Sequence, residues 1–234
     1  MLIKHHASTR GLANHGWLQS FHTFSFGEYY NPQRMGFGAL RVINDDKVSP
    51  GMGFGRHPHQ DMEIISIPLH GVLRHQDSMG HTSEIRPGEV QLMSAGTGIF
   101  HSEMNGSYKE EVQFLQIWVL PEKLGIKPHY QQRKFERSFA ENSWQLLISP
   151  NGDEGSLVIN QQAWFSLAYL PEGTLSYQRK RETSGVYVFL IEGEVQINQE
   201  VFSKRDGGGF LHTSTLNFQA QHPSTILLME VPFQ

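Results

Sequence analysis

The sequence of 234 residues contains no cysteine. This absence excludes disulfides, metal or iron–sulfur sites held by thiolates, and cysteine nucleophiles. The chain also lacks an excess of positive charge, because 19 lysines and arginines stand against 23 aspartates and glutamates. A protein that neutralises nucleic-acid phosphates is usually basic, so we expect no direct binding of nucleic acid.

Long hydrophobic runs are missing as well. No segment approaches the roughly 18 consecutive apolar residues that a membrane-spanning helix needs. Residues 1–16 contain no continuous apolar stretch of the kind found in secretory signals. We therefore expect no membrane association, and the absence of cysteine agrees with a cytoplasmic location.

Histidine, by contrast, is abundant, with 13 residues in the chain. Because no thiolate is available, any site for a transition metal must be built from imidazole and carboxylate groups. The chain contains no P-loop, dinucleotide-binding fingerprint, nucleophile elbow or HExxH motif that would indicate a different chemistry.

The pattern of the chain indicates strands rather than helices. Short β-branched and aromatic runs are separated by Gly, Pro, Asn and Asp, which predicts an all-β chain of antiparallel sandwiches or barrels. These runs are 39–46, 62–71, 89–96, 112–121, 156–160, 163–170, 186–198, 214–220 and 224–231. The best helical candidate is short and polar, at 131–139, and a boundary between two β units is expected within 130–150.

A faint internal repeat supports two such units. The run around Gly71 and the run around Gly193 both read as strand, glycine turn and strand, with an offset of 122 residues. Gly88 matches Gly207 or Gly208 at an offset of about 120. Two similar β units of about 110 residues fit the length of the chain.

Two pairs of potential metal ligands lie in the first unit. In a strand, side chains at positions i and i+2 point to the same face, so His57 and His59 lie side by side, as do His101 and Glu103. If both segments are strands of one barrel, the two pairs can converge on one divalent ion. On a six-coordinate ion they would leave two positions for water, substrate or dioxygen.

These residues resemble the motifs of the cupin superfamily. Its first motif, G-x5-H-x-H-x3/4-E-x6-G, is similar to the segment from Gly51 through His57, His59 and Glu63 to Gly71, apart from one extra residue before the last glycine. Its second motif fits 88–105 less well. The departures, together with segments 15–32, 75–81 and 94–105, resemble the pirin branch of the superfamily across essentially the whole chain.

The resemblance implies a bicupin fold, with two antiparallel, jelly-roll-like β-barrel domains packed face to face. We expect an N-terminal metal-binding domain at 1–135 and a C-terminal domain without metal ligands at 136–234. Pirins use the glutamate two residues beyond the third histidine, which implies that His57, His59, His101 and Glu103 hold the ion. Many cupins instead use the glutamate of the first motif, here Glu63, which then stays open as a ligand or as a partner that orients an imidazole.

The repeat offset places other residues at the ligand positions of the second unit. His57 and His59 map to Arg179 and Arg181, while His101 and Glu103 map near Ala220 and His222. No ligand set survives there, and residues 179–181 are expected to be a solvated charge run rather than an anion site. Among the remaining histidines, His75 and His81 flank a turn that we place at the pocket rim.

Two functions compete. The resemblance implies a metal-dependent dioxygenase of the quercetin 2,3-dioxygenase type, with Glu103 as catalytic base and a flavonol-like enol and dioxygen as substrates. The alternative is a non-enzymatic regulator that senses metal or redox state and binds a protein partner. Iron is the first candidate for the single divalent transition metal ion, with Cu, Ni, Co, Mn and Zn as alternatives, because this ligand set is permissive.

Overall fold

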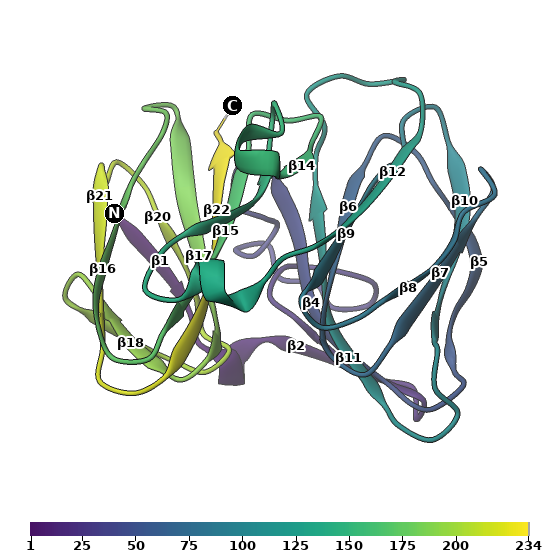
Figure 1. Cartoon of the computed structure of the whole chain (residues 1–234), viewed down its shortest axis with the longest axis horizontal. Coiled ribbons are helices and arrows are strands. Elements are labelled where there is room, and N and C mark those ends of the chain that lie inside the picture. Colours follow the sequence, from purple (N-terminus) through teal and green to yellow (C-terminus); the bar gives the residue numbers. More distant parts are fainter. Residues whose placement is uncertain (234) are drawn as a thin grey trace.

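The structure, a computed structural model that describes residues 1–233, consists of two β-barrels side by side (Figure 1). Each barrel pairs a seven-stranded sheet with a four-stranded sheet. The two large sheets face each other at the centre of the molecule, and the small sheets lie outermost (Figure 1). The all-β, two-barrel architecture expected from the sequence is thus confirmed.

The first barrel contains most of the N-terminal half. Its large sheet has the order β12 (His129–Lys134), β9 (Glu89–Ser94), β6 (Glu63–His70), β11 (Val112–Val119), β4 (Leu40–Val48), β3 (Leu18–His22), β2 (Gly11–Asn14). Its small sheet has the order β5 (Gly53–His59), β10 (Ile99–Asn105), β7 (Leu73–Asp77), β8 (Thr82–Ile85).

The second barrel repeats this arrangement. Its large sheet has the order β1 (Leu2–His5), β20 (Gly207–Phe210), β17 (Ser184–Glu192), β22 (Ser224–Pro232), β15 (Trp164–Leu170), β13 (Gln145–Ser149), β14 (Leu157–Val158). Its small sheet has the order β16 (Gly173–Gln178), β21 (Thr215–Ala220), β18 (Glu194–Ile197), β19 (Glu200–Ser203). Three short 3-10 helices complete the chain: η1 (Ala7–Thr9), η2 (Arg137–Ala140) and η3 (Asp153–Gly155).

The matching strand orders confirm the predicted duplication. Gly71 connects β6 to β7, and Gly193 connects β17 to β18 at the equivalent corner of the second barrel. Both have positive φ, 74° and 91°. An L side chain rarely adopts such a conformation, which explains why the repeat is most visible at these two glycines.

Two details differ from the sequence-based expectations. The helix expected at 131–139 is wrong: β12 occupies His129–Lys134 and pairs with β9, and only η2 follows. In addition, β1 at the N-terminus pairs with β20 of the second barrel rather than with the first (Figure 1). Residues 2–5 therefore close the second sheet at the position that β12 takes in the first, which departs from a simple division of the chain at 135.

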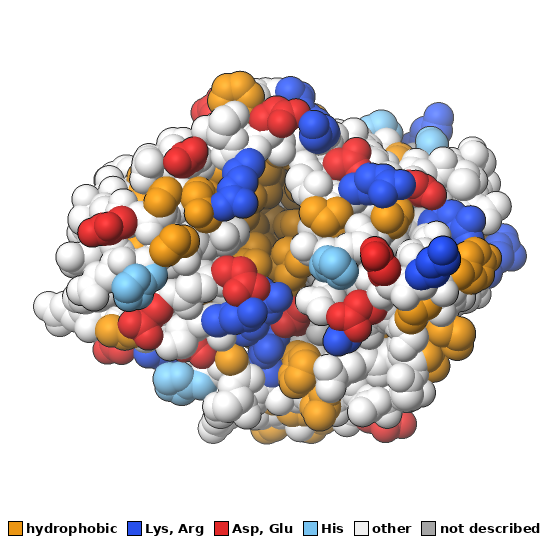
Figure 2. Space-filling model, turned by 60° about the horizontal axis from the view of Figure 1, so that its bottom comes forward, with side chains coloured by type: hydrophobic (Ala, Val, Ile, Leu, Met, Phe, Trp, Pro, Cys, Tyr) orange, Lys and Arg blue, Asp and Glu red, His pale blue; other side chains and the backbone are white. Residues whose placement is uncertain are grey.

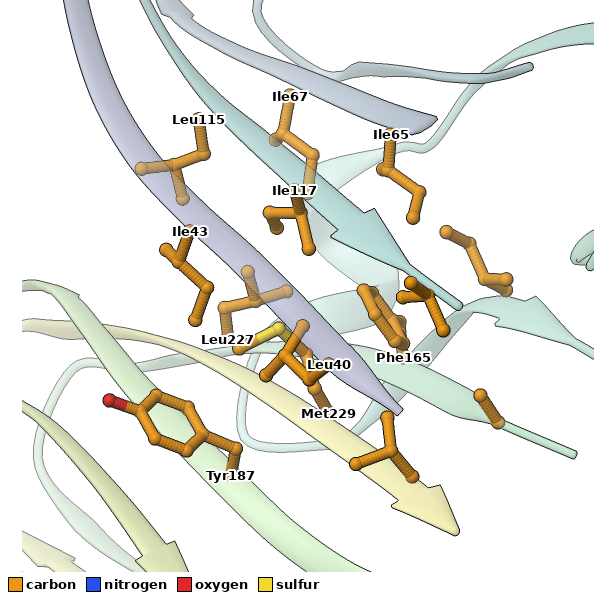
Figure 3. Close-up of a cluster of buried hydrophobic side chains, with 14 of the residues drawn as sticks. Leu40, Ile43, Ile65, Ile67, Leu115, Ile117, Phe165, Tyr187, Leu227 and Met229 are labelled. Carbon is orange, nitrogen blue, oxygen red and sulfur yellow. The ribbon is translucent and has the colours of Figure 1, made fainter. Parts of the chain in front are cut away.

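The two large sheets enclose the main hydrophobic core (Figure 3). Ile43, Ile65 and Ile117 of the first barrel pack toward Phe165 and Met229 of the second barrel. All five side chains are fully buried. Because side chains alternate along a strand, each large sheet commits one face to this interface and the other to the interior of its own barrel.

The conservative variant Ile117→Val tests the tightness of this core. Ile117 is 0% exposed, so loss of one methylene should lower the free energy of unfolding by about 1 kcal/mol. Ile3→Val, at a strand position that is 38% exposed, is the matched control and should have almost no effect. Urea denaturation of both variants measures the difference, and equal stabilities would contradict the packing described here.

The interiors of the two barrels differ in chemistry. The second is filled by apolar side chains, among them Val195, Ile197, Leu216 and Phe218. In strand pairing, Leu216 faces Tyr177 as His101 faces His57, so these residues, rather than the arginines found by offset, occupy the ligand positions of the second barrel. The sequence mapping to Arg179, Arg181, Ala220 and His222 was wrong because the structural offset is 120 residues between β5 and β16 and 115 residues between β10 and β21, whereas the glycine turns are 122 residues apart.

The surface carries charges of both signs in mixture. On the face shown in Figure 2, acidic and basic side chains alternate around a central hollow, inside which hydrophobic side chains are visible. The charge run at 179–181 lies on the second barrel, and its backbone N–H groups at Lys180 and Arg181 donate to the buried carboxylate of Glu230. Within residues 1–233, no helix has the length and apolar character needed to cross a membrane.

Candidate metal centre

Three imidazoles converge in the first barrel, as the sequence predicted. His57 and His59 lie on β5, and His101 lies on the neighbouring strand β10 directly opposite His57. The ring centroids are 4.5 Å apart for His57 and His101, 4.8 Å for His59 and His101, and 4.9 Å for His57 and His59. Each ring offers a nitrogen within 4.8 Å of the others, which is the spacing of ligands around one ion. Phe100, which directly precedes His101 on β10, points outward and is exposed.

The protonation state of these rings suits metal binding. The Nδ1 of His57 lies 2.7 Å from the carbonyl oxygen of Gly55, to which it donates, so its Nε2 presents a lone pair. Burial, reinforced by the neighbouring imidazoles, lowers the pKa of His59 to about 4 and that of His101 to about 3. Both rings are therefore neutral near pH 7 and available as ligands.

The same cluster leaves polar atoms that a cation would satisfy. His59 Nε2 is buried and has no hydrogen-bond partner within residues 1–233. The Nε2 atoms of His57 and His101 face each other at 3.0 Å. Buried polar atoms are normally paired, and a divalent transition metal ion among three imidazole nitrogens would supply the missing partner. The residues present therefore fit one such ion.

Glu103 lies beside this cluster and is 2% exposed. Ser66 Oγ donates to its Oε1 at 2.8 Å, and Gln116 Nε2 donates to its Oε2 at 2.8 Å. Glu103 forms a second possible ligand group with His101 and the buried His75. The four predicted ligands thus fall into two overlapping groups that share His101, and the role of Glu103 as the fourth ligand stays a prediction.

Glu63 faces a different part of the molecule. Its Oε2 accepts hydrogen bonds from Ser94 Oγ at 2.7 Å and from the backbone N–H of Asn160, beyond the first barrel, at 3.2 Å. Burial raises its pKa. Glu63 is an even number of residues from His57 and His59, so an uninterrupted strand would point all three side chains to one face. This alternation is lost because Asp61, with φ 47°, interrupts the extended chain between β5 and β6. Within residues 1–233, Glu63 makes no hydrogen bond to an imidazole.

His75 is not at the pocket rim, and that expectation was wrong. Its side chain is fully buried in the barrel interior, stacked on Tyr130, with its Nε2 3.1 Å from Asp77 Oδ2. His81 alone is partly exposed, and its Nδ1 lies 3.0 Å from the same Oδ2. The pair His75 and Asp77 has the i, i+2 spacing used to find the other ligands, so this signal was present in the sequence.

A cavity of about 720 Å³ opens beside His57, His59 and Glu103. Its wall includes four polar residues of the large sheet that sequence reasoning missed, namely Ser20, His22, Asn44 and Asp46. These residues come in two i, i+2 pairs on β3 and β4, and that alternation of buried polar side chains was the signal for them. The lining also includes the aromatic rings of Phe26, Tyr29, Phe54 and Trp118.

Comparisons with known proteins agree with this architecture. The Pirin family profile matches residues 5–119, and that of the quercetinase C-terminal cupin domain matches residues 146–231. A quercetin 2,3-dioxygenase of Escherichia coli K12 is 44% identical over 99% of both chains.

Two crystal structures of the bacterial pirin YhhW from Escherichia coli superpose closely. One has a TM-score of 0.96 at 43% identity and covers 100% of this chain and 99% of that one. The other, a complex with nickel(II), has a TM-score of 0.95 at 42% identity and covers all of both chains. With two cupin barrels, a histidine cluster in the first and relatives of this identity over its full length, the chain belongs to the pirin family.

Proposed function

We propose that the protein is a metal-dependent dioxygenase of the quercetin 2,3-dioxygenase type, acting on a flavonol-like enol with dioxygen. The observation that carries this proposal is the convergence of three imidazoles, two of which, His57 and His59, line one cavity of about 720 Å³ together with the buried carboxylate of Glu103. A cavity of this size accommodates a small organic substrate beside an ion. The name of the Escherichia coli relative with 44% identity supports the reaction class.

His57, His59, His101 and Glu103 would hold one divalent transition metal ion, with iron as the first candidate. The bound ion would supply Lewis-acid polarisation of the substrate oxygens and a route for electrons to dioxygen. Nickel is present in a structure of the related bacterial pirin, which supports the permissive character of the ligand set.

Glu103 would remove the proton of the enol hydroxyl. It is held by Ser66 Oγ on Oε1 and by Gln116 Nε2 on Oε2, so neither oxygen can turn freely. Gln116 is itself fixed, because its Oε1 accepts a hydrogen bond from Trp118 Nε1 at 3.1 Å. A general base must first lie within reach of the proton that it removes, and only then does its pKa decide its efficiency. The two hydrogen bonds fix the carboxylate in one position, as this requirement demands.

Aromatic side chains would hold the flat ring of the substrate and exclude water from it. Trp118 packs edge-on against His59 at 5.0 Å and against Phe26 at 5.3 Å. The aromatic lining therefore continues from the ion site to Phe26, which lies on the segment between β3 and β4. Rings in this arrangement bind another aromatic ring through stacked or edge-to-face contacts.

The test is oxygen-dependent loss of quercetin absorbance. We expect turnover by protein loaded with Fe(II), Ni(II), Co(II), Mn(II) or Cu(II) in air, no loss under argon, and no turnover by the protein treated with a chelator. His129→Ala, an exposed histidine outside both ligand groups, is the control and should retain full activity. Intact metal binding without turnover of quercetin by any loaded form would reject the proposal and favour the regulatory alternative.

A further inference from the structure

A second group of polar side chains lines the cavity that His57 and His59 also line. Ser20 and His22 on β3 and Asn44 and Asp46 on β4 are each no more than 4% exposed. They line the same cavity as His57, His59 and Glu103. Neither the metal nor the proposed base needs them, although burying four polar groups in a barrel carries a cost unless they are paired.

The hydrogen bonds within this group leave acceptors facing the cavity. Ser20 Oγ donates to Asp46 Oδ1, and Asp46 Oδ2 has no partner within residues 1–233. Asn44 Oδ1 lies 2.8 Å from His22 Nδ1 and accepts a hydrogen bond from it, and Ser20 Oγ lies 3.3 Å from the same nitrogen. Because Nδ1 is the donor, Nε2 of the neutral ring is an acceptor. Burial lowers the pKa of His22, in keeping with a neutral ring. Two acceptors without donors suit two hydroxyl groups on a ligand, because each hydroxyl donates one hydrogen bond.

The space between the two polar groups is aromatic. The ring of His22 lies 5.3 Å from Phe26, and Phe26 lies 5.3 Å from Trp118, which contacts His59. A flat ring system lying along these side chains would present one end to the histidines and the other to His22 and Asp46. Asp46 and Glu103 line the same cavity.

We propose that Asp46 and His22 each accept a hydrogen bond from a phenolic hydroxyl group of the substrate, remote from the reacting enol. This inference rests on the proposed function for the position of the enol. It defines the substrate class more narrowly, as an aromatic enol that carries further phenolic hydroxyls on the same planar ring system. Asp46 and His22 are then residues that determine specificity, and Ser20 and Asn44 position them through their hydrogen bonds.

The test compares two flavonols that share the enol. Quercetin carries further phenolic hydroxyls, whereas 3-hydroxyflavone carries none. Dissociation constants of both, measured by calorimetry with the Ni(II)-loaded protein without oxygen, separate recognition from turnover. Burial raises the pKa of Asp46 to about 7. The titration is therefore carried out at pH 8, where this carboxylate is mostly ionised. Asp46→Ala should weaken quercetin binding roughly tenfold and change 3-hydroxyflavone binding less than twofold.

Two further variants serve as a second test and as a control for this result. Asp46→Asn keeps the shape of the side chain and should weaken quercetin binding in the same direction if the alanine variant fails to fold. Lys47→Ala, on the same strand but exposed, is the matched control and should bind both flavonols like the unchanged protein. An equal loss of affinity for both flavonols, no loss for either, or no binding of quercetin by the unchanged protein would overturn the proposal. Selective binding without oxidation would instead reject only the proposed reaction.

Discussion

Replacement of His101 by alanine should reduce Ni(II) affinity by about 100-fold or more, the largest effect expected for a single histidine. His101 belongs to both possible ligand groups, with His57 and His59 on one side and with His75 and Glu103 on the other. Its removal therefore breaks every three-residue ligand group found in residues 1–233. Loss of a group that merely supports a ligand costs 10- to 100-fold in affinity, and loss of a ligand should cost at least as much. Calorimetric titration with Ni(II) and elemental analysis after dialysis measure the change.

Companion variants locate the ion within the two groups. If the ion lies among His57, His59 and His101, His57→Ala should weaken binding strongly, whereas His75→Phe should leave most of it. His222→Ala, on an exposed turn of the second barrel, is the control and should bind like the unchanged protein. Retention of full Ni(II) affinity by His101→Ala would show that the cluster is not the metal site.

The two-barrel fold was accessible from the sequence because local patterns decide most of it. Short β-branched runs separated by turn residues predict strands, and two glycines with positive φ mark the same corner in each barrel. The convergence of His57, His59 and His101 was also predictable. It needs only the two-residue period of strands and the pairing of neighbouring strands in one sheet.

Other features depend on long-range contacts that no local pattern encodes. The pairing of Leu2–His5 with Gly207–Phe210 joins segments about 200 residues apart, and the sequence of β1 does not identify its partner. The polar character of 131–139 predicts a short helix, but His129–Lys134 pairs as a strand with the edge of β9. Contact with a partner strand overrides intrinsic propensity in such cases.

The orientation of single side chains was predictable only within an uninterrupted strand. The alternation of side chains along the strand holds from His57 to His59. It fails at Glu63, because the loop around Asp61 interrupts the strand. The polar pairs on β3 and β4 were hidden for a different reason. Asn44 and Asp46 lie at the polar end of the predicted run 39–46, and only burial in the barrel reveals their alternation.

Glu103→Gln should lower kcat/KM for quercetin by about 100-fold or more in samples kept saturated with metal. Three imidazoles would still hold the ion under these conditions, and glutamine keeps the shape that Ser66 and Gln116 contact. The amide cannot take up the proton of an enol, and removal of a general base typically costs 10²- to 10⁴-fold in rate. Steady-state turnover in air, with metal content measured on the same samples, separates loss of the base from loss of the ion.

Glu63→Gln is the matched control for this experiment, because it makes the same chemical change at the other buried glutamate of the cupin motifs. Glu63 bonds to Ser94 and Asn160 on the side of the sheet away from the cavity, so its variant should keep turnover within about twofold. Its Oε1 is buried without a partner, and an amide there removes a charge that is costly to bury. If Glu63→Gln abolished turnover and Glu103→Gln did not, the base would be Glu63, and the hydrogen bonds that hold Glu103 would serve only the packing of the barrel.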